Sequence, residues 1–502
     1  MMEEFDAIII GAGVAGLFCA FKLSREGKRV LLIERQPLPG GYATTFSRKG
    51  FTFESSLHCV GGLGKKGEVR KFLTEQGILQ DGDFIELHDF ARNIYPEHDF
   101  IVDFNKEHLI ASLKRLFPAQ EKDIDSFFRA LDVFYKQFDA FCEKRFPAFL
   151  NPLIVPFMYP QVIKANNCTL DKFIEPYIKD PKLKALITNL WKYAGLPPSR
   201  VSALYFLLIF EEYYYESTAY VRGGFMKLFT RMVERMRESG SQVRFNTSVE
   251  RIVTQDGKAV RSVITDTKEE FGARVIISNA NAIDTLTVLL DNEKLKERYY
   301  KKVSSLEKSI SAFQVYLGLD VPLKALGMDC AILSVSTSYS PDEEFACCES
   351  GDYEHCSFEI TAHSQIDPSL VPPGKGSLLL ITFDTYAHWK GLKGQAYKAK
   401  KAEVAQTLIR RAEQYLPGLS KHIEVMEAAT PKTMQRYTLS PEGALYGFAQ
   451  TVGQSGTNRL AQETHCKGLL LTGAWTLPGG GFFGCFISGI EAADLALQYL
   501  RC

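Results

Sequence analysis

The sequence predicts an α/β fold in which a nucleotide-binding domain is interrupted by an inserted α+β domain. Residues 5–34 run through an apolar strand, a glycine-rich turn, a helix and a second apolar strand, which is the opening of a βαβ unit. Alternating apolar and polar residues predict further strands over 243–278. A strand, a second glycine-rich turn and a helix follow over 468–500. We therefore expect these three regions to contribute to one domain, with the rest of the chain inserted between them.

The elements between these regions define the inserted domain. Helical periodicity extends over 106–145 and most of 170–240. Within 243–278, outside the inserted domain, Asp256-Gly257 between two alternating runs predicts a hairpin. Strands are also expected at 311–319 and 376–383, and an amphipathic helix at 396–417. The nucleotide-binding domain is expected to consist of 1–75, 219–285 and 465–502, and the substrate-binding domain of 76–218, which is mostly helical, and 286–464.

Composition excludes several classes of protein. The chain has 502 residues, of which 46% are apolar and 24% charged, as in ordinary globular proteins. Basic and acidic residues number 59 each, so the net charge gives no indication of nucleic-acid binding. Eleven cysteines without a CxxC pair favour reduced thiols and a cytoplasmic location. The nine histidines are dispersed, and we expect no metal site.

Two long uncharged segments bear on membrane contact. Residues 468–490 carry Pro478-Gly479-Gly480-Gly481 in their middle, and this broken backbone argues against a membrane span. Residues 146–163 contain four prolines, so no regular helix is expected there. This segment is either a surface piece that enters a membrane interface, which would place the protein peripherally at a membrane, or a loop-rich part of the core.

The strongest motif is Gly11-Ala12-Gly13-Val14-Ala15-Gly16, which has the GxGxxG spacing between an apolar strand and a helix. Glycines at these places allow a tight turn, the close approach of a pyrophosphate and close packing of helix on strand. The helix N-terminus then offers its N–H groups to the diphosphate. Glu34 ends the second strand, where a carboxylate accepts the ribose hydroxyls of an adenosine. The motif predicts a Rossmann-like dinucleotide-binding domain.

Gly40-Gly41 extends this motif and is followed by Thr44 and Thr45. The stretch from Gly11 to Thr45 resembles the dinucleotide-binding motif of glutathione-reductase-like flavoproteins, including the amine oxidase and phytoene desaturase branch. The resemblance implies FAD rather than NAD as the cofactor. No second GxGxxG follows a strand, which argues against a separate domain for NAD(P)H.

The segment 473–484 narrows the family further. Its run through Pro478 and three glycines, with Ser488-Gly489 after it, resembles the closing motif of phytoene desaturases, carotenoid isomerases and all-trans-retinol saturases. A strand ending in Gly473-Ala474 lets the backbone approach the cofactor, and the following helix N-terminus can stabilise negative charge on a reduced flavin. Many relatives have His-Pro where this chain has Leu477-Pro478, so no acid–base role is assigned there.

The middle of the chain agrees with this resemblance. Arg222-Gly223-Gly224-Phe225 is similar to a glycine element of the family, and Val249 occupies the position at which relatives pair their backbone with adenine. The turn motif and the resemblance together imply FAD contacts at Gly11, Gly13, Val14, Ala15, Gly16, Glu34, Arg35, Gly40, Gly41, Thr44, Val249, Gly473, Ala474, Gly481, Phe482 and Phe483.

Residues 49–58 offer the one candidate catalytic side chain. Retinol-saturase-like proteins tend to have an acid, a glycine and then a His at similar offsets. Here Glu54 is the acid, Ser55 or Ser56 replaces the glycine, and His58 remains. A His near the flavin can donate a proton to a carbanion-like carbon. The alternative is a structural His that is hydrogen-bonded within the cofactor loop.

Aromatic residues concentrate between 205 and 220. Such a helix either packs in a core or lines a substrate tunnel, and the tunnel hypothesis assigns Phe206, Phe210, Tyr213 and Tyr214. The pair Glu211-Glu212 is then either a solvated face or a polar end of the tunnel.

The family resemblance implies an FAD-dependent oxidoreductase that desaturates, saturates or isomerises carbon–carbon bonds of a long apolar polyene or isoprenoid lipid, such as a carotenoid or retinoid. A substrate of this kind is held by shape and apolar surface. Its electron partner would be a quinone, oxygen or a small redox protein. The alternatives are a flavin amine oxidase acting on a polar amine, and a flavin-stabilised, membrane-associated scaffold.

Overall fold

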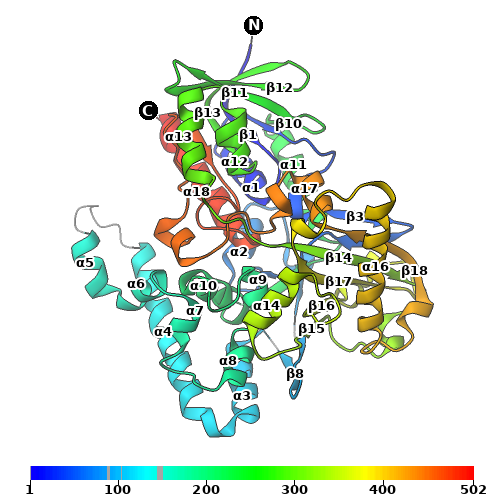
Figure 1. Cartoon of the computed structure of the whole chain (residues 1–502). Helices are drawn as coiled ribbons and strands as arrows, with labels where there is room; N and C mark the ends of the chain where they lie inside the picture. The colour runs from blue at the N-terminus through cyan, green and yellow to red at the C-terminus, as the bar shows by residue number, and fades with distance from the viewer. Residues whose placement is uncertain (1, 88–90, 103, 144–150, 217, 502) are drawn as a thin grey trace.

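The computed structural model describes residues 2–87, 91–102, 104–143, 151–216 and 218–501 (Figure 1). Two seven-stranded sheets organise the fold. The first sheet lies with both chain termini in the upper part of Figure 1, the second lies at the right, and a block of helices extends to the lower left.

The first sheet carries the predicted βαβ opening. Its order is β10-β2-β1-β13-β12-β11, and β19 also pairs with β13. The strands are β1 (Glu3–Ile10), β2 (Val30–Ile33), β10 (Gln242–Arg244), β11 (Val249–Gln255), β12 (Ala259–Thr265), β13 (Glu270–Ser278) and β19 (Leu469–Leu471). β1 pairs in parallel with β2 and β13, and β19 in parallel with β13. The predicted α/β, Rossmann-like class is confirmed.

The turn between β11 and β12 confirms the predicted hairpin. Asp256 and Gly257 have φ angles of 53° and 67°, and two consecutive positive φ values are what a tight hairpin turn requires. The two strands pair antiparallel from Val249 to Thr265.

Three helices pack against the first sheet or against one another beside it: α1 (Val14–Arg25), α11 (Phe225–Glu238) and α18 (Phe482–Arg501). Phe18 of α1 meets Phe486 of α18 edge to face, with ring centroids 4.9 Å apart. α18 begins at Phe482, directly after the glycine run that ends at Gly481. The chain therefore enters α18 directly from its glycine turn.

The second sheet has the order β18-β14-β17-β16-β15-β7-β8. Its strands are β7 (Ala91–Ile94), β8 (Asp99–Val102), β14 (Ser311–Leu319), β15 (Ile332–Val335), β16 (Phe358–Thr361), β17 (Gly376–Asp384) and β18 (Ile423–Ala429). Helices α14 (Pro341–Ser350) and α16 (Gly394–Ala412) contact it. β14 and β17 begin and end within a residue of the predicted strands.

The helical block contains α3 (Lys106–Leu116), α4 (Glu121–Glu143), α5 (Asn151–Met158), α6 (Pro160–Asn166), α7 (Leu170–Ile174), α8 (Pro181–Ile187), α9 (Trp191–Ala194) and α10 (Ala203–Tyr214). The expectation that prolines exclude helix from 146–163 is wrong for 151–163; residues 146–150 lie outside the described ranges. Pro160 stands in the first turn of α6, where a missing N–H costs little. Pro156 lies inside α5, which is only eight residues long.

A small sheet joins the helical block to the nucleotide-binding region. It consists of β5 (Val60–Gly61), β9 (Thr218–Val221) and β6 (Phe84–Glu86), so β9 is a strand inside a stretch that we predicted as mostly helical. The remaining elements are β3 (Thr45–Arg48), β4 (Phe51–Glu54), α2 (Glu68–Glu75), α12 (Ala282–Asp284), α13 (Glu293–Val303), α15 (His363–Ile366) and α17 (Pro431–Thr438). Across the described residues, no helix combines the length and apolar character that a membrane span requires.

Candidate active site

Backbone geometry requires glycine at two positions of the turn between β1 and α1, Gly11 and Gly16. Gly11 has a φ of 94°. A Cβ atom on Gly16 would lie 2.1 Å from the carbonyl oxygen of Gly11, and one on Gly13 would lie 2.7 Å from Nδ2 of Asn279. Gly13 is the N-cap of α1, and the first turn of this helix contains no acidic residue. The N–H groups at the start of α1 can therefore receive a diphosphate.

Glu34 lies at the carboxyl end of β2 and joins two parts of the turn. Its Oε2 accepts a hydrogen bond of 2.7 Å from the Ala12 N–H, and its Oε1 accepts one of 2.7 Å from the Gln36 N–H. Burial raises the pKa of Glu34 above its usual 4.5, although these two hydrogen bonds oppose the shift. The carboxylate is thus fixed in place beside the glycine turn.

Asn279, directly after β13, connects the glycine segments from opposite ends of the chain. Its Nδ2 donates a 3.3 Å hydrogen bond to the Gly11 carbonyl. Its Oδ1 would lie 2.5 Å from a Cβ atom placed on Gly473, whose φ is 95°. We did not predict Asn279 as a site residue. The available signal was a polar residue immediately after a buried strand, where α/β sheets bind their ligands.

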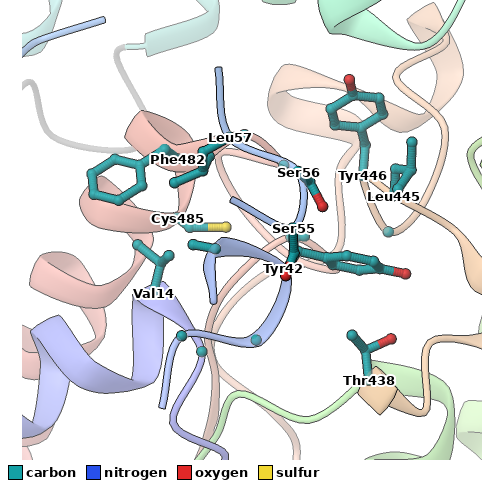
Figure 2. A pocket seen from close by; sticks show the side chains of 18 of the residues that line it. Val14, Tyr42, Ser55, Ser56, Leu57, Thr438, Leu445, Tyr446, Phe482 and Cys485 are labelled. Carbon is teal, nitrogen blue, oxygen red and sulfur yellow. The ribbon is translucent and has the colours of Figure 1, made fainter. Parts of the chain in front are cut away.

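A single cavity of about 1160 Å³ contains most of the predicted FAD contacts. Figure 2 shows part of its wall, where Val14 and Phe482 approach from α1 and α18, and Tyr42, Ser55 and Tyr446 lie opposite. The predicted FAD contacts that line it are Gly11, Gly13, Val14, Ala15, Glu34, Arg35, Gly40, Gly41, Thr44, Val249, Ala474, Gly481, Phe482 and Phe483. Gly16 and Gly473 are not among the lining residues. The glycine cradle and the fixed carboxylate of Glu34 fit a dinucleotide.

Three of these residues also fix neighbouring segments. Arg35 donates hydrogen bonds of 2.8 and 2.9 Å to the carbonyl oxygens of Arg436 and Tyr437. Thr44 donates one of 3.0 Å to the Pro39 carbonyl. Gly40 has a φ of 114°, and its N–H donates to the Ala12 carbonyl at 2.7 Å. The glycine pair therefore packs directly against the turn that precedes α1.

Of the four predicted tunnel residues, one lines the cavity. Tyr213 lines the cavity, whereas Phe206, Phe210 and Tyr214 lie in the hydrophobic core. The face of α10 that reaches the cavity instead carries Tyr205, Leu208, Ile209 and Glu212. These residues follow helical spacing and are neighbours on one face, and the core aromatics lie on another.

Carboxylates line another part of the cavity. Burial raises the pKa of Glu211 to about 8 and that of Glu216 to about 7, and it raises the pKa of Glu212 well above its usual 4.5. All three residues are lining residues. Of the two interpretations left open for Glu211-Glu212, a polar part of the tunnel is the one that this position favours.

Glu54 and His58 have separate environments. Glu54 accepts hydrogen bonds from the Tyr220 hydroxyl at 2.7 Å and from the Phe225 N–H at 3.1 Å, so it caps the start of α11. Burial raises the pKa of Glu54 to about 8. His58 lines the cavity, and its Nδ1 lies 2.5 Å from Oε1 of Glu359 in β16. Glu359 also lines the cavity, and we did not predict it.

Replacing Glu34 by glutamine should weaken FAD binding about tenfold, because a charge-assisted hydrogen bond contributes about 1.5–3 kcal/mol and a neutral one less. An ionised carboxylate accepts ribose hydroxyls more strongly than a protonated carboxyl group does. Since burial raises the pKa of Glu34 above 4.5, FAD affinity of the unmodified protein should fall on acidification before an exposed Glu would titrate. Fluorescence titration of the apoprotein with FAD across mildly acidic pH measures both effects. An equally steep pH dependence in Glu34→Gln would contradict this assignment.

Comparisons with known proteins agree with this site. A family model described as flavin containing amine oxidoreductase matches residues 14–497. Prolycopene isomerase from Arabidopsis thaliana is 26% identical over 98% of this chain and 84% of its own length. All-trans-retinol 13,14-reductase from Danio rerio is 24% identical over 99% of this chain and 86% of its own length. The predicted resemblance is confirmed by the family match and these relatives.

A solved structure shows how widely the fold is shared. Putrescine oxidase bound to putrescine superimposes with a TM-score of 0.64 at 14% identity, covering 99% of each chain. This likeness concerns the fold alone, whereas the family match extends from α1 into α18. The chain is therefore a flavin-dependent oxidoreductase, and it belongs to the flavin containing amine oxidoreductase family.

Proposed function

We propose that this FAD-dependent oxidoreductase acts on carbon–carbon bonds of a long apolar polyene or isoprenoid lipid. The observation that carries the proposal is one continuous cavity of about 1160 Å³, which includes both the glycine turns and the inner face of α10. This volume exceeds the range of about 300–1,000 Å³ that is usual for pockets of drug-sized ligands, and the cavity extends from the glycine turns to α10. Two relatives are named for a carotenoid and a retinoid substrate.

The positions of the lining residues support the cofactor-binding roles that the family resemblance implies. The start of α1 and the Gly11–Gly16 turn would hold the diphosphate, and Glu34 would hold the ribose. Val249 would contribute backbone to the adenine, and the segment Gly481–Phe483 at the start of α18 would contact the flavin. When bound, the flavin supplies two-electron hydride chemistry. The protein contributes alignment and exclusion of water.

Hydride exchange at one carbon of a carbon–carbon bond requires that a proton be added to, or removed from, the other carbon. His58 holds or moves this proton. It is buried, it lines the cavity, and a carboxylate fixes one of its ring nitrogens. The reaction is a desaturation, a saturation or a redox-neutral cis–trans isomerisation. Electrons would pass to or from a quinone, oxygen or a small redox protein.

A second candidate, oxidation of a polar amine, has one observation in its favour. The carboxylates of Glu211, Glu212 and Glu216 line the cavity and could pair with an ammonium group. Burial raises the pKa of each, however, so these groups carry less negative charge at neutral pH than exposed carboxylates. These carboxyl groups therefore suit an uncharged end of the substrate better than an ammonium group.

Anaerobic flavin spectroscopy separates the two candidates. The oxidised and the dithionite-reduced protein are mixed with prolycopene, all-trans-retinol and putrescine. The polyene proposal predicts a change of flavin absorbance or of polyene isomer composition with a polyene and none with putrescine. Flavin bleaching by putrescine alone would overturn it.

We also propose peripheral membrane contact through 146–163. Phe157 of α5 is 88% exposed and Met158 is 42% exposed, and α5 packs on α6, which packs on α4. Phe138 and Cys142 of α4 line the cavity, so a lipid entering here would have a short path.

Phe157→Ser should weaken co-sedimentation with phosphatidylcholine vesicles about tenfold or more, since burial of a Phe side chain contributes about 1.5–3 kcal/mol. Tyr300→Ser is the matched control, because Tyr300 of α13 is another aromatic side chain that is largely exposed, at 62%. Equal vesicle binding by both variants would contradict the proposed contact.

A further inference from the structure

The second sheet contributes an ionised carboxylate to the cavity wall. Glu359 lies in β16, and its side chain is 9% exposed. Burial alone would raise its pKa, but the neighbouring His58 and the ammonium of Lys192 hold the pKa of Glu359 below 4.5. An ionised carboxylate in so buried a place requires partners that stabilise its charge.

His58 is the closest of these partners. Its Nδ1 lies 2.5 Å from Oε1 of Glu359 and 3.3 Å from the Thr361 hydroxyl. Its other ring nitrogen, Nε2, has no hydrogen-bond partner among the described residues, and His58 lines the cavity. The carboxylate therefore holds the proton on Nδ1 and leaves Nε2 as the nitrogen available to a bound molecule.

Two residues of α9 complete the surroundings of the carboxylate. The Tyr193 hydroxyl donates to Oε2 of Glu359 at 3.4 Å. Lys192 Nζ donates to the hydroxyls of Ser334 and Ser336, each at 3.0 Å, and its charge acts on Glu359 without a direct bond. Both carboxylate oxygens of Glu359 therefore have partners, which restricts its rotation.

The other titratable groups near His58 cannot replace it. His363 of α15 donates from Nε2 to the Leu57 carbonyl at 2.7 Å, and burial lowers its pKa to about 3. Burial raises the pKa of the Cys59 thiol and of the Tyr213 hydroxyl above their usual values. At neutral pH these three groups are uncharged and poor at exchanging protons.

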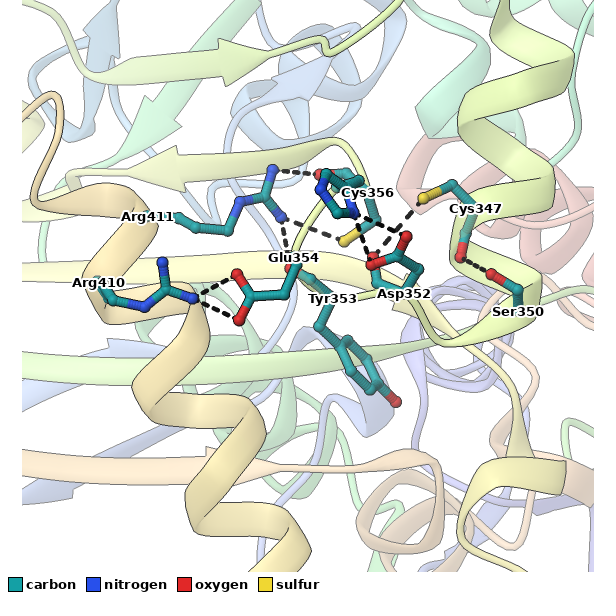
Figure 3. A network of polar contacts seen from close by, with 9 residues as sticks. Cys347, Ser350, Asp352, Tyr353, Glu354, Cys356, Arg410 and Arg411 are labelled. Carbon is teal, nitrogen blue, oxygen red and sulfur yellow. Dashed lines mark hydrogen bonds and ion pairs between the residues drawn. The ribbon is translucent and has the colours of Figure 1, made fainter.

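The strand that carries Glu359 is anchored from behind (Figure 3). Arg411 of α16 donates hydrogen bonds to the carbonyl oxygens of Tyr353 and Cys356, at 2.7 and 2.5 Å, in the loop that enters β16. β16 is also paired on both sides, with β15 and β17. The position of Glu359 is thus set by rigid backbone, as a precise proton-transfer geometry needs.

We propose that Glu359 is the positioning residue of a proton-transfer pair in which Nε2 of His58 exchanges the proton with a substrate carbon. This inference rests on the proposed function and deepens it. Saturating a carbon–carbon double bond adds a hydride to one carbon and a proton to the other. The flavin cofactor, when bound, would supply the hydride. For saturation, Nε2 of His58 first takes a proton from water, which gives an imidazolium ring that Glu359 stabilises through Nδ1. The N–H bond at Nε2 then breaks as the C–H bond forms, and a neutral imidazole remains. Desaturation follows the same steps in reverse.

Nitrogen-15 NMR of the histidine-labelled holoenzyme tests the pair without turnover. Glu359→Gln should change the His58 ring signals, assigned by their loss in His58→Gln, because the tautomer is no longer fixed at Nδ1. Glu344→Gln is the matched control, since Glu344 is a buried carboxylate near Lys192 that makes no hydrogen bond or ion pair with His58 among the described residues. Unchanged His58 signals in Glu359→Gln would overturn the inference and leave the proposed function untouched.

Turnover in D₂O gives the second readout, with the polyene that the spectroscopic panel identifies. Glu359→Gln should lower kcat by about a hundredfold, within the range of general acid–base contributions, with little change of KM. Glu359→Asp should recover part of the loss, and its pH profile should differ from that of the unmodified protein. A saturated product should carry deuterium at the carbon that receives the proton. A product without deuterium, or equal losses of kcat in Glu359→Gln and Glu344→Gln, would overturn the inference.

Discussion

Gly13→Val protein is expected to be colourless as purified, with an affinity for FAD at least about a hundredfold lower, equivalent to about 3 kcal/mol. A side chain at this position occupies the space at the N-terminus of α1 where the diphosphate binds. Its Cβ would meet only the end of the Asn279 side chain at 2.7 Å, which can rotate away. The fold should therefore survive while the cofactor is lost.

Absorbance of bound flavin and isothermal titration with FAD measure this loss, and circular dichroism checks the fold. Gly453→Val is the control, because Gly453 is exposed and a Cβ there meets nothing within 4 Å. It should retain its flavin. A fully loaded, yellow Gly13→Val protein would refute the placement of the diphosphate.

His58→Gln is expected to lower kcat by about a hundredfold to a thousandfold, the usual contribution of a positioned general acid or base. Its flavin content should stay near that of the unmodified protein, because His58 is not one of the predicted FAD contacts. Stopped-flow measurement of the flavin with the polyene substrate separates the chemical step from binding.

His363→Gln is the control variant that distinguishes a proton-transfer role of His58 from a purely structural role. His363 is buried like His58, their ring centroids are 6.4 Å apart, and burial lowers the pKa of His363 to about 3. Glutamine can still donate to the Leu57 carbonyl. This variant should keep kcat within about threefold, and matching losses in the two variants would argue that His58 only supports the loop.

The features predicted correctly from the sequence are local ones. The turn from Gly11 to Gly16 and the carboxylate of Glu34 lie within one βαβ unit, so spacing alone defines their geometry. The Asp256-Gly257 hairpin is equally local, because positive φ angles at two adjacent residues determine it. The conformation of such segments is determined by residues that are close together in the sequence.

The features that were missed depend on distant contacts or on the choice of a helix face. The pairing of Glu359 with His58 joins residues 301 positions apart, and it requires the register of β16 in a sheet that sequence patterns do not define. α10 is apolar around most of its circumference, so periodicity could not distinguish the core position of Phe210 from the cavity position of Ile209. Tertiary packing decided both.

The parallel pairing of β19 with β13 has a consequence for how this protein folds during its synthesis. Leu469–Leu471 and α18 are translated after almost everything else, and Ala474 and Phe482 follow β19 into the cavity wall. Ribosomes add about 5–20 residues per second, so β13 waits roughly 10–40 s for β19. Until β19 has paired with β13, the cavity wall at Ala474 and Phe482 is incomplete, so we expect the flavin to be retained only after this segment has been synthesised.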